Sequence, residues 1–258
     1  MAWVLDCDGV IWLADEPIRG AAEAVGRLRE AGERVVFLTN NSFPKVDEHL
    51  AKLARFGMPT EPEDLISSPM AAATLLEPGE RALVLGGPGI LEALEARGVE
   101  PVAPGAEVGD GEVDAVVVGF DLEFDFRRLA AATTALRAGA RLVGTNEDAT
   151  FPTSHGLLPG AGSFLAAVAT AGGARPTIAG KPHRPVADLL VARVGDVSTV
   201  VGDRPSTDGG LARRLGARFA LVLTGVTPQG HGPVDPEPDV EAPDLATLVG
   251  RELAAAGG

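Results

Sequence analysis

Short apolar runs alternate along the chain with segments whose apolar residues recur at helical spacing. Each run is bounded by Gly, Asp or Asn, and continuous apolar runs of this length are typical of strands buried on both faces of a parallel sheet. In residues 21–31, Ala24, Val25 and Leu28 have helical spacing, and Gly32 ends that segment. Strands that alternate with helices predict an α/β fold with right-handed crossovers. The expected strands are residues 3–5, 34–38, 81–85, 114–118, 141–144, 177–179, 199–201 and 219–223.

Polar residues follow several of these expected strands directly. Ligands of an open α/β sheet bind beyond the carboxyl ends of its strands, so these residues are candidates for a functional site. We expect all of them at one edge of a single sheet. They are Asp6, Asp8, Thr39, Asn40, Asn41, Lys181, Gly202 and Asp203.

The middle of the chain is expected to form a second unit with its own strands and helices. The link LEPGE at residues 76–80 is a plausible start for it, and GGARP at residues 172–176 is a plausible end. Residues 228–243 are rich in Pro, Asp and Glu and are expected to form a surface loop. A short final helix is expected over residues 244–256.

Composition and charge narrow the classes of protein. Hydrophobic residues make up 45% of the chain, which is enough for a folded core. The net charge of −14 would repel a polyanion, so a nucleic-acid partner is not expected. A small phosphate ester is different, because one metal ion and one Lys can bind it locally.

Cys7 is the single cysteine, so no internal disulfide can form, which fits a reducing compartment. The N-terminus has no basic region before its apolar run, and no apolar stretch approaches the ~18 residues of a membrane span. We therefore expect a soluble, cytoplasmic protein without a membrane partner.

Two pairs of carboxylates carry the candidate chemistry. In DCDGV, one of Asp6 and Asp8 could attack phosphorus while the other moves protons. In GDRPSTD, Asp203 and Asp208 suit a hard cation, since Mg²⁺ takes one or two carboxylates with waters and substrate phosphate. Taken alone, either motif is equally well explained as a turn with side-chain hydrogen bonds.

The remaining candidates are weaker one by one. Thr39, Asn40 and Asn41 offer a hydroxyl and two amides to phosphate oxygens, although Asn-rich turns are common. Lys181 could neutralise Asp6 and a phosphoryl group, although most lysines are solvated surface residues. Cys7 is expected to be a buried, inert thiol. None of His49, His155, His183 and His231 has the spacing of metal ligands.

Taken together and in this order, the motifs resemble those of the haloacid dehalogenase-like phosphatase superfamily. DCDGV at 6–10, TNN at 39–41, GKPHRP at 180–185 and GDRPSTD at 202–208 match its four motifs. Residues 116–121, 144–148, 151–152 and 158–167 further resemble subfamily IIA, which contains NagD and the p-nitrophenyl, phosphoglycolate and pyridoxal phosphatases.

The resemblance implies a doubly wound, Rossmann-like core with an inserted α/β cap domain of the C2 type. The core would be residues 1–80 and 176–258, and the cap would be residues 81–175. The stretch between DCDGV and TNN is too short for an inserted domain, whereas the stretch between TNN and GKPHRP is long enough. Relatives also imply a homodimer formed through the cap.

The resemblance assigns a role to each matching residue. Asp6 would be the nucleophile that forms an aspartyl-phosphate and a ligand of Mg²⁺, and Asp8 would be the general acid/base and bind the metal through its backbone carbonyl. Asp203 would complete the metal site, and Asp208 would support it from outside the set of direct ligands or through water. The phosphoryl group would be held by Thr39, Asn40, Asn41 and Lys181.

The expected function is Mg²⁺-dependent hydrolysis of a small phosphorylated metabolite. Nucleoside monophosphates, glycerol 3-phosphate, phosphoglycolate, pyridoxal phosphate and sugar phosphates all fit the resemblance. The chain has no Tyr and only 4% aromatic residues, which favours a small aliphatic phosphate over a stacked ring.

Four other functions fit these motifs less well. A phosphotransferase or mutase would share the aspartyl-phosphate, but the long stretch after TNN favours hydrolysis. A dehalogenase would not need Asp8 or Asp203, and a receiver domain would be about half this length. A non-catalytic binding module with the same fold is disfavoured by the intact set of Asp6, Asp8, Lys181 and Asp203.

Overall fold

The computed structural model describes residues 1–104, 112–153 and 156–256. The chain divides into two compact units. The first contains Met1–Thr39, Asp47–Ile66 and Ala187–Gly258, and the second contains Asn40–Val46 and Ser67–Val186. The core and cap domains expected from the sequence stay a prediction, because compactness alone assigns no function to either unit.

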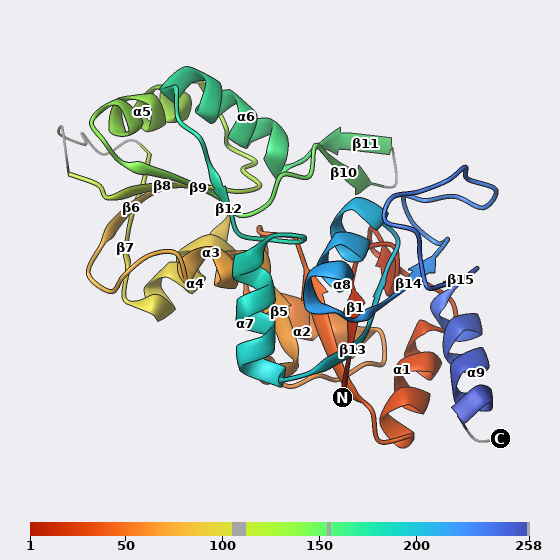
Figure 1. Cartoon of the computed structure of the whole chain (residues 1–258). Coiled ribbons are helices and arrows are strands. Elements are labelled where there is room, and N and C mark those ends of the chain that lie inside the picture. The colour runs from red at the N-terminus through yellow and green to blue at the C-terminus, as the bar shows by residue number, and fades with distance from the viewer. Residues whose placement is uncertain (105–111, 154–155, 257–258) are drawn as a thin grey trace. The chain divides into compact units, whose positions relative to one another are not determined.

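A six-stranded sheet forms the centre of the first unit (Figure 1). The pairs β1–β4, β1–β13, β13–β14 and β14–β15 are parallel. Since β1 is central and covered on both faces, its first four residues are all buried, which explains the continuous apolar run. In sheet order the strands are β15 (Val240–Ala242), β14 (Arg218–Val222), β13 (Val197–Gly202), β1 (Ala2–Asp6), β4 (Arg34–Thr39) and β5 (Leu65–Ser67).

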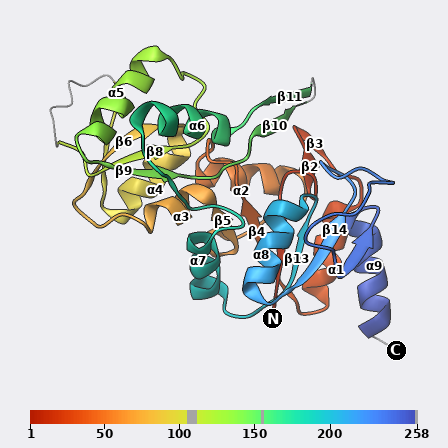
Figure 2. The same ribbon diagram turned by 45° about the horizontal axis from the view of Figure 1, so that its top comes forward.

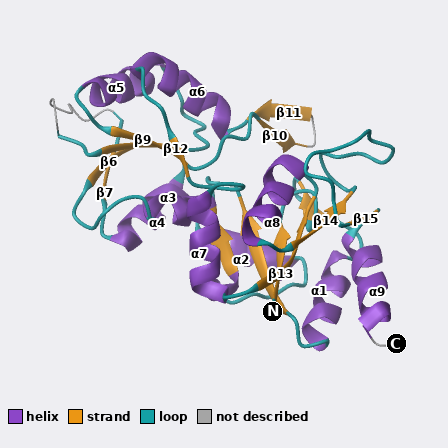
Figure 3. Ribbon diagram, viewed as in Figure 1, coloured by secondary structure: helices purple, strands orange, loops and turns teal. Residues whose placement is uncertain are grey.

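Helices lie against both faces of this sheet. Figure 3 shows α7 and α8 in front of the strands and α2 behind them, and α1 packs beside α9. A short antiparallel hairpin, β2 (Trp12–Leu13) and β3 (Glu16–Pro17), follows β1. The helices are α1 (Ala21–Glu30), α2 (Val46–Arg55), α7 (Arg184–Val194), α8 (Gly210–Leu215) and α9 (Leu245–Ala256), with a 3-10 turn over Pro62–Asp64 and a π-helical turn over Pro205–Gly209.

The second unit contains a parallel five-stranded sheet with its own apolar core. Figure 1 shows α5 and α6 on one face of this sheet and α3 and α4 on the other. In sheet order the strands are β12 (Thr177–Ile178), β9 (Arg141–Gly144), β8 (Ala115–Val118), β6 (Arg81–Leu85) and β7 (Glu100–Val102). The helices are α3 (Ser68–Ala73), α4 (Pro88–Arg97), α5 (Phe126–Arg137) and α6 (Ala161–Gly172).

A second hairpin precedes α6. Its strands are β10 (Thr150–Thr153) and β11 (Gly156–Pro159), which pair antiparallel. Figure 2 shows this hairpin projecting from the start of α6.

The structure corrects two sequence-based expectations. The run at 177–179 was expected to end at the same sheet edge as Asp6, but β12 pairs with β9 in the five-stranded sheet. A strand of two residues carries too little apolar pattern to show which sheet it joins. Residues 228–243 are not loop throughout, because Val240–Ala242 forms the edge strand β15.

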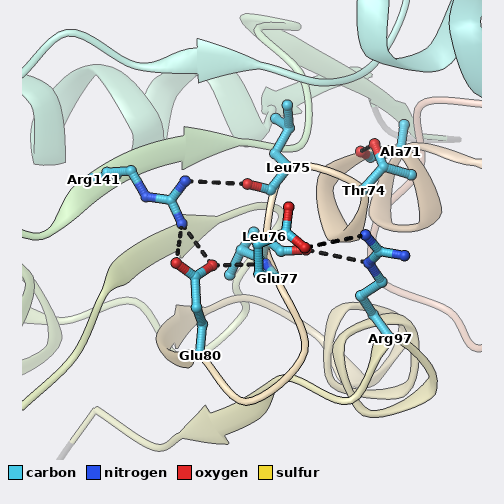
Figure 4. A network of polar contacts seen from close by, with 8 residues as sticks. All are labelled: Ala71, Thr74, Leu75, Leu76, Glu77, Glu80, Arg97 and Arg141. Atoms are coloured by element: carbon cyan, nitrogen blue, oxygen red, sulfur yellow. Dashed lines mark hydrogen bonds and ion pairs between the residues drawn. The ribbon is translucent and has the colours of Figure 1, made fainter.

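Polar contacts hold the link at residues 76–80 within the second unit (Figure 4). Arg141 donates to both carboxylate oxygens of Glu80, at 2.8 and 2.7 Å, and also to the carbonyl oxygen of Leu75 at 3.3 Å. Arg97 donates to the carbonyl oxygen of Leu76 at 3.2 Å. These contacts fix the link beside the strands that it precedes.

Within the described residues, no helix is both long and apolar enough to cross a membrane.

Gly26 provides a test of helix stability in the first unit. It lies within α1, and a Cβ added there would meet nothing within 4 Å. Because Ala loses less backbone entropy than Gly in a helix, Gly26→Ala should raise the free energy of unfolding by about 0.5–1 kcal/mol. Urea denaturation measures the change. Gly32→Ala is the control, since its φ of +81° disfavours a side chain and should reverse the sign. Equal effects of the two substitutions would contradict this account.

Candidate active site

Three carboxylates come together at the carboxyl ends of strands in the first unit. Asp6 ends β1, Asp203 follows the end of β13, and Asp208 lies in the π-helical turn after it. One carboxylate oxygen from each of the three lies within 4.8 Å of the others. The parallel pairing of Leu5 with Val201 brings these strand ends side by side. This confirms the predicted shared edge for Asp6 and Asp203.

The carboxylate cluster fits a divalent cation. Asp203 is 4% exposed and Asp208 is fully buried, so their negative charges have little solvent to screen them. Like charges at this separation repel strongly unless a cation lies among them. Mg²⁺ prefers carboxylate oxygens and is typically bound by one or two of them. The described residues therefore provide a donor set suited to Mg²⁺.

Glycines allow the close packing around Asp203. A Cβ on Gly9 would lie 2.5 Å from Asp203 Oδ2, and a Cβ on Gly225 would overlap the same oxygen. The backbone N–H of Val226 donates to that oxygen. Asp208 is fixed in a similar way, because the Arg204 N–H donates to its Oδ2 at 3.1 Å. Both carboxylates therefore accept hydrogen bonds from the backbone.

Asp6 and Asp8 occupy different surroundings despite their spacing of two. The Cys7 N–H donates to Asp6 Oδ1 at 2.8 Å, and the chain then turns at Gly9, whose φ is +83°. Asp8 accepts a 3.0 Å hydrogen bond at Oδ1 from the indole nitrogen of Trp12. Cys7 between them is buried, as predicted.

The predicted phosphate-binding residues fall into two groups. Thr39 is buried at the end of β4 in the first unit. Asn40 and Lys181 belong to the second unit, where Asn40 Oδ1 accepts from the Lys181 N–H at 2.9 Å and Asn40 Nδ2 donates to the Lys181 carbonyl at 3.3 Å. Lys181 is 3% exposed, so it is not a solvated surface lysine. The Asn41 side chain accepts from the Phe43 N–H at 3.2 Å, as in the turn considered above.

Asn40 is also held by residues to which the sequence assigned no role. Asn40 Nδ2 donates to Asp148 Oδ2 at 3.0 Å, and Asn146 Nδ2 donates to the Asn40 carbonyl at 2.8 Å. The Ser68 hydroxyl donates to the same carbonyl at 2.8 Å. Asn146 and Asp148 follow the end of β9, so the strand-end criterion applied to the other candidates would have found them.

Of the histidines considered, His155 lies outside the described residues.

The parallel sheets and the carboxylates that converge at the strand ends place this chain in the class of α/β proteins with an acidic site suited to a metal ion. Two family models match the chain. The model described as haloacid dehalogenase-like hydrolase matches residues 3–100, and the model described as HAD-hydrolase-like matches residues 178–248.

Curated relatives agree with these family models. The chain is 38% identical to D-glycerol 3-phosphate phosphatase of Mycobacterium tuberculosis over 86% of its own length, and it spans 63% of that relative. It is 33% identical to a 5'-nucleotidase of Bacillus subtilis over 95% of both proteins. The chain belongs to the haloacid dehalogenase-like hydrolase family.

A solved structure of a relative supports the same fold and contains magnesium. Glycerol phosphate phosphatase of Mycobacterium tuberculosis in complex with magnesium superposes with a TM-score of 0.85 and 35% identity, over 96% of this chain and 75% of that one. This likeness confirms the predicted Rossmann-like α/β fold. Together with the carboxylate cluster, it identifies Mg²⁺ as the cofactor of the family site.

The packing of Gly225 against Asp203 predicts a metal-binding defect. Gly225→Ala places a Cβ against Asp203 Oδ2 and against the Gly9 backbone, so Asp203 must move out of the cluster. Mg²⁺ affinity measured by calorimetry should fall about 10- to 100-fold, the usual effect of losing a group that orients a metal ligand. Gly26→Ala is the matched control and should bind Mg²⁺ as wild type does. An unchanged affinity for Gly225→Ala would show that Asp203 does not bind the ion.

Proposed function

We propose that this protein is a Mg²⁺-dependent phosphatase that hydrolyses small phosphate monoesters through an aspartyl-phosphate on Asp6. The observation that carries the proposal is the convergence of Asp6 with Asp203 and Asp208 at the carboxyl ends of β1 and β13. Family membership and relatives named as phosphatases support the reaction class. The predicted homodimer and the cytoplasmic location remain predictions.

The proposed reaction has two steps on the same carboxylate. An oxygen of Asp6 forms a bond to phosphorus while the bond from phosphorus to the ester oxygen breaks, and Asp8 gives that oxygen its proton. Asp8 then takes a proton from water as the water oxygen attacks phosphorus. The bond from phosphorus to Asp6 breaks, which releases phosphate and restores the Asp6 carboxylate and the protonated Asp8.

The phosphoryl group is negatively charged, and the roles proposed for the metal ion and the remaining site residues follow from that charge. Asp6, Asp203 and Asp208 would hold Mg²⁺, with Asp8 contributing its backbone carbonyl as the resemblance implies. When bound, the ion offsets negative charge on the phosphoryl oxygens. The hydroxyl of Thr39 and the amides of Asn40 and Asn41 would bind those oxygens. Lys181 would neutralise the charge that Asp6 and the phosphoryl group share.

For the substrate, we infer a small aliphatic phosphate such as glycerol 3-phosphate. The scarcity of aromatic residues supports this choice, because a nucleobase or pyridoxal ring usually stacks on an aromatic side chain. A relative named as a glycerol 3-phosphate phosphatase points the same way. The relative named as a 5'-nucleotidase makes nucleoside monophosphates the comparison substrates.

Substitution of the proposed nucleophile tests the reaction. Wild type with Mg²⁺ should release phosphate from p-nitrophenyl phosphate and glycerol 3-phosphate, and EDTA should stop it. Asp6→Asn keeps the shape of the side chain but cannot form the acyl phosphate, so kcat should fall about 10³-fold or more. Acid-quenched wild type should carry a hydroxylamine-labile phosphate that Asp6→Asn lacks.

Gly26→Ala should retain wild-type activity and serves as the control for substitution itself. Folded wild type that hydrolyses neither substrate, nor a panel of nucleoside and sugar phosphates, would overturn the proposed function. Preference for a nucleoside monophosphate would overturn only the proposed substrate class.

A further inference from the structure

Trp12 lies beside the proposed acid/base Asp8, and the sequence assigned it no role. Its indole Nε1 donates to Asp8 Oδ1 at 3.0 Å, and the side chain is 2% exposed. Backbone hydrogen bonds join the two ends of the turn that contains Asp8 and Trp12. The Gly9 N–H donates to the Trp12 carbonyl at 2.7 Å, and the Trp12 N–H donates to the Cys7 carbonyl at 3.2 Å. The indole therefore meets Asp8 from a fixed position.

Side chains from the α2 region hold the indole in place. Lys52 Nζ lies 4.4 Å from the centre of the Trp12 ring and donates to the Ala14 carbonyl at 2.7 Å. The ring of Phe56 lies 6.0 Å away, centre to centre. A cation is attracted to the face of an indole ring, so Lys52 helps to keep the Trp12 ring in this position.

We propose that Trp12 is a positioning residue that sets the orientation of the Asp8 carboxylate for proton transfer to the leaving group. Because indole only donates, Trp12 cannot take or pass a proton itself and acts through Asp8. Engaging Oδ1 fixes the rotation of the carboxylate and therefore the direction in which its oxygens face. This inference rests on the proposed function, in which Asp8 protonates the ester oxygen.

The inference predicts a dependence on the leaving group. When the bond from phosphorus to oxygen breaks, an alkyl ester would leave as a strongly basic alkoxide unless Asp8 gives it a proton. The p-nitrophenolate ion is stable enough to leave without one. A disoriented Asp8 therefore slows the first step for glycerol 3-phosphate much more than for p-nitrophenyl phosphate. A merely structural role for Trp12 would slow both substrates alike.

The test compares kcat/KM of Trp12→Phe on these two substrates with saturating Mg²⁺. Phe keeps most of the buried ring but removes the N–H donor. For glycerol 3-phosphate, kcat/KM should fall about tenfold or more, as expected for losing a hydrogen bond to a charged group. For p-nitrophenyl phosphate it should fall less than about threefold. Trp3→Phe, the other tryptophan and also buried in this unit, should lower neither value.

A second variant keeps the test informative if Trp12→Phe does not fold by circular dichroism. Lys52→Met retains an unbranched side chain over the ring but removes the cation, so it should give a smaller loss with the same substrate dependence. Equal losses on both substrates, or no loss, in the folded variants would overturn the positioning role while the proposed function stands. Wild type inactive on both substrates would overturn both proposals.

Discussion

The parallel pairing of β1 with β13 is the constraint on which the site depends. It places two strand ends from opposite ends of the chain side by side, and each end carries an aspartate. Bringing carboxylates together in a buried place costs free energy, because burial removes the water that screens them. The sheet can hold the carboxylates together because most residues of β1 and β13 are buried, which stabilises the pairing of these strands. A cation bound among the carboxylates would offset the repulsion between their negative charges.

Backbone groups help to fix the acidic side chains in this arrangement. Asp203 and Asp208 each accept a hydrogen bond from a nearby backbone N–H, and glycine at positions 9 and 225 leaves room for the Asp203 oxygen. Donors of this kind do not reorient when charge changes on the ligand, which is what a preorganised site requires. The glycines beside the aspartates are therefore part of the site, although they contribute no chemistry.

Sequence alone predicted most strands of the two sheets, but not β5, β7 or β15, and it predicted the meeting of Asp6 with Asp203, because continuous apolar runs and strand-end polar residues are local signals. It failed where the outcome depends on distant partners. The short strand before Lys181 joins β9 through pairing that two residues cannot encode. The bond from Asn40 to Asp148 spans 108 positions, so no local pattern reveals it. The sequence assigned no role to Trp12, because only the three-dimensional position of its N–H connects it with Asp8.

The net negative charge of the chain and the local charges of the site act on a ligand over different distances. A net charge of −14 acts over the whole surface and weakens the approach of any anion, and solvent ions screen it within a Debye length of about 8–10 Å. The local charges act at contact distance in partly dry surroundings, where they are much less screened. The net charge therefore disfavours a long polyanion more than a small phosphate ester, which has to reach only the local site.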